Sequence, residues 1–89
     1  MVDDMSAPIR VFSRPGCHLC EQLVEELLPL VRGRVAVEVV DVESRPDWKQ
    51  EYGLRIPLVE FDGQFVCQYH LDRGAIRRIL EKLPASKAV

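Results

Sequence analysis

Two cysteines separated by two residues, Cys17 and Cys20, are the side chains of this chain best placed to do chemistry. They follow an apolar run over residues 9–12 and a Ser-Arg-Pro-Gly turn over residues 13–16, and they open an amphipathic segment that continues to Leu28. The pattern therefore predicts two thiols at the junction of a strand and a helix. Backbone N–H groups and the positive end of the helix dipole favour a thiolate there, which makes a cysteine reactive toward disulfides.

The helical spacing predicts different surroundings for the two thiols. Cys20 lies in register with Leu23 and Leu27 and should face the core, whereas Cys17 lies at the helix start and can meet solvent. This difference is typical of an attacking thiol and a resolving thiol. We therefore hypothesise that Cys17 attacks a substrate disulfide and that Cys20 resolves the mixed disulfide. The alternative is a surface thiol beside a core thiol, without redox chemistry.

The remaining candidate ligands are too few for a metal site. Three cysteines without a visible secretion signal argue against a framework of structural disulfides, so the CxxC is a redox pair or half of a metal site. A zinc site needs about four ligands, and only His18, Cys67 and His70 could complete it. We expect no metal, and we expect Cys67 to be a small buried or half-buried strand residue, with a third redox thiol as the alternative.

Length and composition indicate one small globular domain. The chain has 89 residues, of which 47% are hydrophobic and 29% charged, with a net charge of −2. We expect a single domain over residues 1–89, with a core over about 8–83 and flexible tails over 1–7 and 84–89. The charge gives no reason to expect a nucleic-acid partner, and no apolar run is long enough to span a membrane. We predict a cytoplasmic monomer.

Hydrophobic periodicity predicts the element order β-α-β-α-β-β-α. The expected strands cover residues 8–12, 35–42, 58–61 and 64–69. The expected helices begin at the CxxC and end or kink at Pro29, begin at a Ser44 cap and end at Gly53, and begin at an Asp72 cap. Asp62-Gly63 predicts a tight hairpin, and the first β-α-β unit should be right-handed and parallel. These elements give a four-stranded mixed sheet covered by helices.

Residues 12–20, Phe-Ser-Arg-Pro-Gly-Cys-His-Leu-Cys, resemble the active-site segment of glutaredoxins. Ile56-Pro57 resembles the second motif of the thioredoxin fold, a cis-proline that faces the dithiol. Together with the element order, the resemblance covers about residues 8–83 and is closest to glutaredoxin-like bacterial proteins of unassigned function. It implies an α/β, three-layer thioredoxin/glutaredoxin-like fold and a thiol-disulfide oxidoreductase that acts on protein or small-molecule disulfides.

The resemblance also suggests supporting residues. Arg14 is a candidate for stabilising the thiolate and pairing with a substrate carboxylate, with a solvated turn residue as the alternative. His18 could stabilise the Cys17 thiolate when protonated, or it could point into solvent. The resemblance implies that the cis-proline Pro57 leaves Ile56 free to pair with an extended substrate chain beside the dithiol.

One departure from glutaredoxins concerns glutathione. The Gly-Gly pair where the glutathione backbone docks in glutaredoxins falls here on Cys67 and Gln68, which place side chains where close approach favours glycine. In glutaredoxins an aspartate follows the Gly-Gly pair and contacts the substrate. The corresponding Asp72 stands about one residue further along, so the resemblance supports a substrate contact of Asp72 only weakly. We expect no bound cofactor and weak or absent glutathione binding, and we leave open whether glutathione or a thioredoxin-reductase-like system donates electrons.

Two other functions stay open at this point. One is a non-catalytic thioredoxin-fold module that binds a partner through the edge at Pro57. The other is a glutaredoxin that ligates an iron–sulfur cluster together with glutathione.

Overall fold

The computed structural model describes residues 7–83, and its elements follow the predicted order. The strands are β1 (Ile9–Ser13), β2 (Val37–Asp41), β3 (Leu58–Phe61) and β4 (Gln64–Gln68). The helices are α1 (His18–Val31), α2 (Pro46–Tyr52) and α3 (Arg73–Lys82), and a short 3₁₀ turn, η1 (Val42–Ser44), precedes α2. The predicted tails lie, apart from residue 7, outside the described residues.

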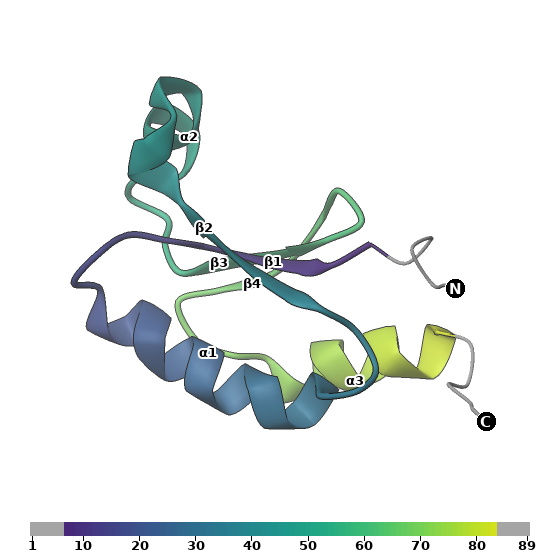
Figure 1. Ribbon diagram of the computed structural model, residues 1–89. Coiled ribbons are helices and arrows are strands. Elements are labelled where there is room, and N and C mark those ends of the chain that lie inside the picture. The colour runs from purple at the N-terminus through teal and green to yellow at the C-terminus, as the bar shows by residue number, and fades with distance from the viewer. Residues whose placement is uncertain (1–6, 84–89) are drawn as a thin grey trace.

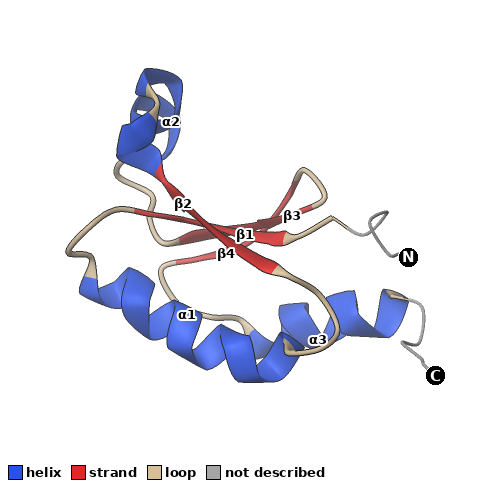
Figure 2. Ribbon diagram, in the orientation of Figure 1, coloured by secondary structure: helices blue, strands red, loops and turns tan. Residues whose placement is uncertain are grey.

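The four strands form the mixed sheet that the sequence predicts, in the order β2-β1-β3-β4 (Figure 2). β1 is parallel to β2, because α1 crosses over between them, and antiparallel to β3. β3 and β4 form the predicted antiparallel hairpin. Its turn residues Asp62 and Gly63 have φ angles of 53° and 78°, and two consecutive positive φ angles are what a tight type I′ turn requires.

Side chains of β1 alternate between two layers of core. Ile9 and Val11 face α1 and α3, which lie together on one side of the sheet (Figure 1). The buried residues of this larger cluster are Ile9, Val11, Leu23, Leu27, Val31, Val59, Cys67 and Ile76. Phe12 faces the opposite side, where Val40, Val42 and Leu58 join it beneath Trp48 and Tyr52. The sheet thus lies between the α1–α3 layer and α2.

α1 does not end at Pro29 but continues to Val31. Proline removes a hydrogen bond and crowds the preceding turn, yet its ring here lies on the exposed side of the helix. Val31 is buried in the larger core cluster, so packing keeps the last turn helical. Gly33, with φ 79°, then supplies the left-handed residue that reverses the chain.

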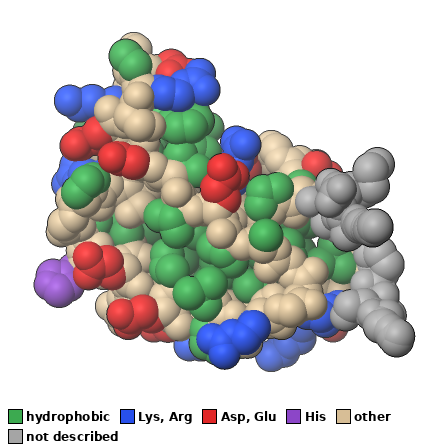
Figure 3. Space-filling view, viewed as in Figure 1, with side chains coloured by type: hydrophobic (Ala, Val, Ile, Leu, Met, Phe, Trp, Pro, Cys, Tyr) green, Lys and Arg blue, Asp and Glu red, His purple; other side chains and the backbone are tan. Residues whose placement is uncertain are grey.

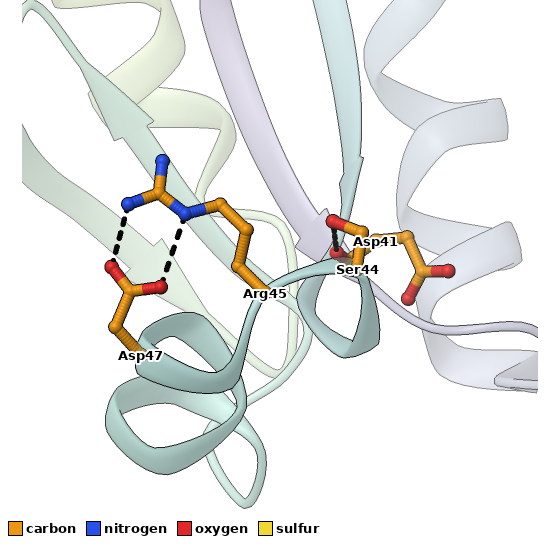
Figure 4. Close-up of polar contacts among 4 residues, drawn as sticks. All are labelled: Asp41, Ser44, Arg45 and Asp47. Atoms are coloured by element: carbon orange, nitrogen blue, oxygen red, sulfur yellow. Dashed lines mark hydrogen bonds and ion pairs between the residues drawn. The ribbon is translucent and has the colours of Figure 1, made fainter.

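The predicted Ser44 cap of α2 is wrong. Ser44 belongs to η1, and its hydroxyl donates to the Asp41 carbonyl at 2.7 Å (Figure 4). Arg45 takes the cap position without a capping side chain, and Pro46 begins the helix. The Arg45 guanidinium donates to both carboxylate oxygens of Asp47, at 3.0 and 2.8 Å, and this hydrogen bonding holds the pKa of Asp47 below its usual value. Asp47 is thus the acidic residue of the first turn of α2, and it is paired with Arg45.

Two strands are shorter than predicted. β2 starts at Val37 rather than Val35, and its expected last residue, Val42, begins η1 and packs in the Phe12 cluster on the α2 side of the sheet. β4 ends at Gln68 because Tyr69 has a φ angle of 71°, a left-handed conformation that cannot continue a strand.

The surface is mixed in character. Figure 3 shows hydrophobic side chains gathered between the sheet and the helices on one face, with charged side chains around them. The basic residues of α3 are exposed, as expected of a solvated helix face: Arg73, Arg77, Arg78 and Lys82. No helix within residues 7–83 has the length and apolar character needed to cross a membrane.

Replacing Phe12 with alanine tests the smaller core cluster. Phe12 is 1% exposed and stacks on Tyr52 with ring centroids 4.2 Å apart. We expect Phe12→Ala to lower the free energy of unfolding by about 3–5 kcal/mol, measured by urea denaturation. Phe65, which is 58% exposed, is the matched control, and Phe65→Ala should change stability by about 0.5 kcal/mol or less. Equal losses in both variants would contradict this assignment of the core.

Candidate active site

The candidate site starts where β1 turns into α1. Gly16 has a φ angle of 80°, the left-handed conformation that favours glycine, and the Cys17 N–H donates to the Arg14 carbonyl at 3.3 Å. Cys17 is the N-cap of α1, and its sulfur accepts a hydrogen bond from the Cys20 N–H at 3.2 Å. A thiol thus takes the role that a serine or aspartate oxygen usually has at a helix start.

Cys17 and Cys20 are bonded as a disulfide, with Cα atoms 5.3 Å apart, a separation usual for such bonds. Cys20 is 1% exposed, whereas Cys17 is only half-buried. The predicted difference in burial is therefore confirmed. Cys17 is therefore the more accessible of the two cysteines, while Cys20 is covered by the core.

The segment before β3 lies at the same edge of the sheet. The antiparallel register pairs Phe12 with Leu58, so the preceding residue, Pro57, lies opposite Ser13. Pro57 is therefore next to the loop that carries Cys17. The Ile56–Pro57 peptide bond is cis, and Pro57 is buried. Ile56 packs against the Phe12 cluster, and its backbone N–H and C=O form no hydrogen bond with the described part of the chain. An extended chain that approaches Cys17 would find these two groups free.

Tyr69 is a site residue that sequence reasoning missed. Its N–H donates to the Pro57 carbonyl at 2.7 Å, and its hydroxyl donates to the Leu54 carbonyl at 3.3 Å. Its φ of 71° is unusual for a residue with a side chain and costs roughly 1–2 kcal/mol. The sequence carries only a weak sign of this role, namely an aromatic residue between the last strand and the Asp72 cap.

Arg14 and His18 are both exposed on either side of Cys17. Within residues 7–83, neither side chain forms a hydrogen bond or an ion pair with another residue. The structure therefore leaves both free to face an incoming substrate, and their roles stay predictions.

Asp72 and Cys67 lie beyond the dithiol. Asp72 caps α3 as predicted, since its carboxylate accepts the Ala75 N–H at 3.0 Å. Its substrate contact stays a prediction. Cys67 is buried as predicted, and burial raises the pKa of its thiol. Among the described residues, no group of three His, Cys, Asp or Glu side chains could hold a metal ion.

A shallow depression of about 80 Å³ adjoins the site. Side chains from the first turns of α1, including Leu19 and Leu23, form one wall, and residues 69–71 form the other. A larger hollow of about 660 Å³ lies between β4 and α3, and its lining includes neither cysteine of the dithiol nor Pro57. The lining of the smaller depression also lacks these three residues, but it includes Leu19, which lies between the two cysteines in the sequence, and Tyr69, so it is the hollow next to the candidate site.

Comparisons with known proteins fit this geometry. Residues 8–81 match the family model of the glutaredoxin-like domain (DUF836). The chain belongs to this glutaredoxin-like family. A glutaredoxin-like protein of Dictyostelium discoideum, named as a homologue of YDR286C, is 26% identical over 85 residues, which cover 88% of this chain and 79% of that protein.

Solved structures show the fold of this glutaredoxin-like protein. Protein Ne2328 of Nitrosomonas europaea is similar with a TM-score of 0.73 and 25% identity, covering 89% of this chain and 98% of that one. XcR50 of X. campestris has a TM-score of 0.66 and 28% identity, covering 85% and 99%. Glutaredoxin C1 of Populus tremula x tremuloides, at 0.54 and 24% identity over 84% and 72%, shares the fold. The predicted thioredoxin/glutaredoxin-like fold is confirmed.

The unequal burial of the three thiols predicts unequal alkylation. After reduction and treatment of the folded protein with iodoacetamide at pH 7.5, we expect Cys17 to react at least about tenfold faster than Cys67, because burial and a raised pKa keep Cys67 an inaccessible thiol. Peptide mass spectrometry measures both rates. Unfolding in urea is the control and should make the rates similar. A Cys67 rate equal to that of Cys17 in the folded protein would contradict the site.

Proposed function

We propose that this glutaredoxin-like protein is a thiol-disulfide oxidoreductase that reduces or exchanges disulfides through Cys17 and Cys20. The observation that supports this most directly is the pair of sulfurs at disulfide distance on the first turn of α1, with one reachable and one covered. A structural disulfide would have no need of an accessible sulfur at a helix N-terminus.

The reaction begins with the reduced dithiol. The Cys17 thiolate attacks one sulfur of the substrate disulfide, a bond forms between those two sulfurs, and the other substrate sulfur leaves as a thiolate. The Cys20 thiol then gives up its proton and attacks the Cys17 sulfur. This step releases the second substrate thiol and leaves the Cys17–Cys20 disulfide, so the substrate gains two electrons and the protein loses two.

The first turn of α1 supplies the stabilisation that this chemistry requires. The Cys20 N–H already points at the Cys17 sulfur at 3.2 Å, and a hydrogen bond to a charged acceptor is stronger than one to a neutral acceptor. The positive end of the helix dipole acts in the same direction. Arg14 and His18 are both exposed beside Cys17. Arg14, together with His18 when it is protonated, attracts an anionic substrate to the thiolate.

A donor must return two electrons to the Cys17–Cys20 disulfide, either from two monothiol molecules, which leave joined as a disulfide, or from a reductase. Glutathione and a thioredoxin-reductase-like system are the two candidate donors. We propose only weak dependence on glutathione, because Cys67 and Gln68 stand at the positions of the glutaredoxin Gly-Gly pair. We further propose that the protein works as a monomer in the cytoplasm on protein or small-molecule disulfides, without a bound cofactor.

Variants of the two cysteines test the proposed roles. In an insulin-reduction assay driven by dithiothreitol, we expect Cys17→Ser to fall to the uncatalysed rate, because the nucleophile is lost. Cys20→Ser, reduced and then freed of dithiothreitol before it is mixed with insulin, should instead accumulate a mixed disulfide at Cys17, detected by mass spectrometry, because neither Cys20 nor a free reductant is present to resolve it. Repeating the assay with glutathione and glutathione reductase, or with thioredoxin reductase and NADPH, identifies the donor. Wild-type turnover by Cys17→Ser would refute the mechanism.

The thiol pKa separates an enzyme from a non-catalytic binding module. We expect the pKa of Cys17 in the reduced protein to lie below the ordinary free-thiol value of about 8.5, because the helix start favours the thiolate. Thiolate absorbance at 240 nm, followed against pH, measures it, with Cys17→Ser as the blank. A value near 8.5 would favour a binding module whose dithiol is unused.

A further inference from the structure

Tyr69 contacts both ends of the segment that connects α2 to β3. Its backbone N–H donates to the Pro57 carbonyl at 2.7 Å, and its side-chain hydroxyl donates to the Leu54 carbonyl at 3.3 Å. The first bond follows from the hairpin register and any residue but proline could make it. The second bond requires a tyrosine, so the side chain adds a fixed point that the sheet alone does not provide.

The segment from Leu54 to Pro57 has few other attachments. Leu54 is 92% exposed, and α2, which precedes the segment, contains no buried residue. The Arg55 N–H donates to the Tyr52 carbonyl at 2.8 Å, and the Arg55 side chain pairs with Glu51 at 3.5 Å and lies over the Tyr52 ring, so within residues 7–83 Arg55 is attached only to α2. Within the segment, only Ile56 and Pro57 reach the core. Segments with so few buried contacts open at low free-energy cost. The hydroxyl of Tyr69 therefore ties the start of this segment to the end of β4, whereas the contacts of Arg55 lead only back to α2.

Tyr69 keeps its position in spite of an unfavourable backbone. Its φ of 71° lies in the left-handed region, where glycine or asparagine would be less strained. Burial of the Tyr69 side chain does not offset this backbone strain, because the residue is 42% exposed. Conformations of this kind persist where surrounding bonds hold them, and they are concentrated at functional sites. Here the two bonds that hold Tyr69 both lead to the segment opposite the dithiol.

The segment carries the free backbone groups of Ile56. Under the proposed function, on which this inference rests, a substrate chain that delivers its disulfide to Cys17 pairs with Ile56. A segment that is already ordered binds such a chain more tightly than one that must first be ordered, because the apparent affinity scales with the population of the competent conformation. A small disulfide contacts only Cys17, so the order of the Leu54–Pro57 segment does not raise its affinity.

We propose that Tyr69 is a positioning residue that selects polypeptide disulfides over small disulfides, by fixing the Leu54–Pro57 segment through its hydroxyl. The residue acts through that segment and takes no part in the exchange of sulfurs. Its effect therefore concerns how a substrate chain binds, and it leaves the reactivity of Cys17 unchanged.

Tyr69→Phe removes the hydroxyl and keeps the ring and the backbone bond. With insulin as the polypeptide disulfide, we expect KM to rise about threefold to tenfold, the range for loss of one neutral hydrogen bond, with kcat changed less than about twofold. With 5,5′-dithiobis(2-nitrobenzoic acid) as the small disulfide, the rate of the reduced protein should stay within about twofold of wild type. Tyr52→Phe is the matched control, because the Tyr52 hydroxyl makes no hydrogen bond with the described residues, and it should change neither substrate.

The outcomes separate this inference from the proposed function. An unchanged KM for insulin in Tyr69→Phe would overturn the positioning role while leaving the oxidoreductase intact. An equal loss on both substrates, or a large fall in the thermal unfolding temperature, would also overturn it, since either result indicates general damage to the fold. A wild-type protein that reduces neither substrate would overturn the proposed function itself.

Discussion

The packing of α1 against β1 is the interaction on which the rest of the structure depends. Ile9 and Val11 of β1 are fully buried beneath the apolar face of α1, so the first turn of the helix is fixed relative to the strand. The short turn at Gly16 then leaves one possible arrangement of the two thiols, with Cys17 outward and Cys20 inward. Because β1 also pairs with both β2 and β3, the same strand brings the loop before β3 to the dithiol.

Much of this arrangement could be predicted from the sequence, because its causes are local. The hairpin at Asp62-Gly63 and the burial of Cys20 follow from turn chemistry and helical spacing, which act within a few residues. The Ser44 cap failed because the Asp41 carbonyl lies within reach of its hydroxyl, and α1 continues past Pro29 because Val31 is buried. The first outcome depends on a competing local turn, η1, and the second on tertiary packing, and spacing along the chain reveals neither.

The same limit explains why the candidate site was only partly predicted. The dithiol is contiguous in sequence, and Ile56-Pro57 forms a recognisable motif, so both could be found without a structure. The contact between Tyr69 and Leu54 joins residues 15 positions apart through one hydroxyl. Membership of the glutaredoxin-like family fixes the fold, whereas substrate preference depends on such individual contacts, because one fold supports many sites.

The sulfur cap of α1 has a thermodynamic consequence. Free-energy linkage is reciprocal, so whatever the helix start contributes to a Cys17 thiolate, the thiolate contributes equally to the folded state of the reduced protein. For a thiol whose folded pKa is depressed, this contribution is present above the unfolded pKa and is lost as the pH falls through the folded pKa. Under the proposed function, acidification therefore lowers the reactivity of Cys17 and the stability of α1 together, since one sulfur atom would be both the nucleophile and the N-cap of the helix.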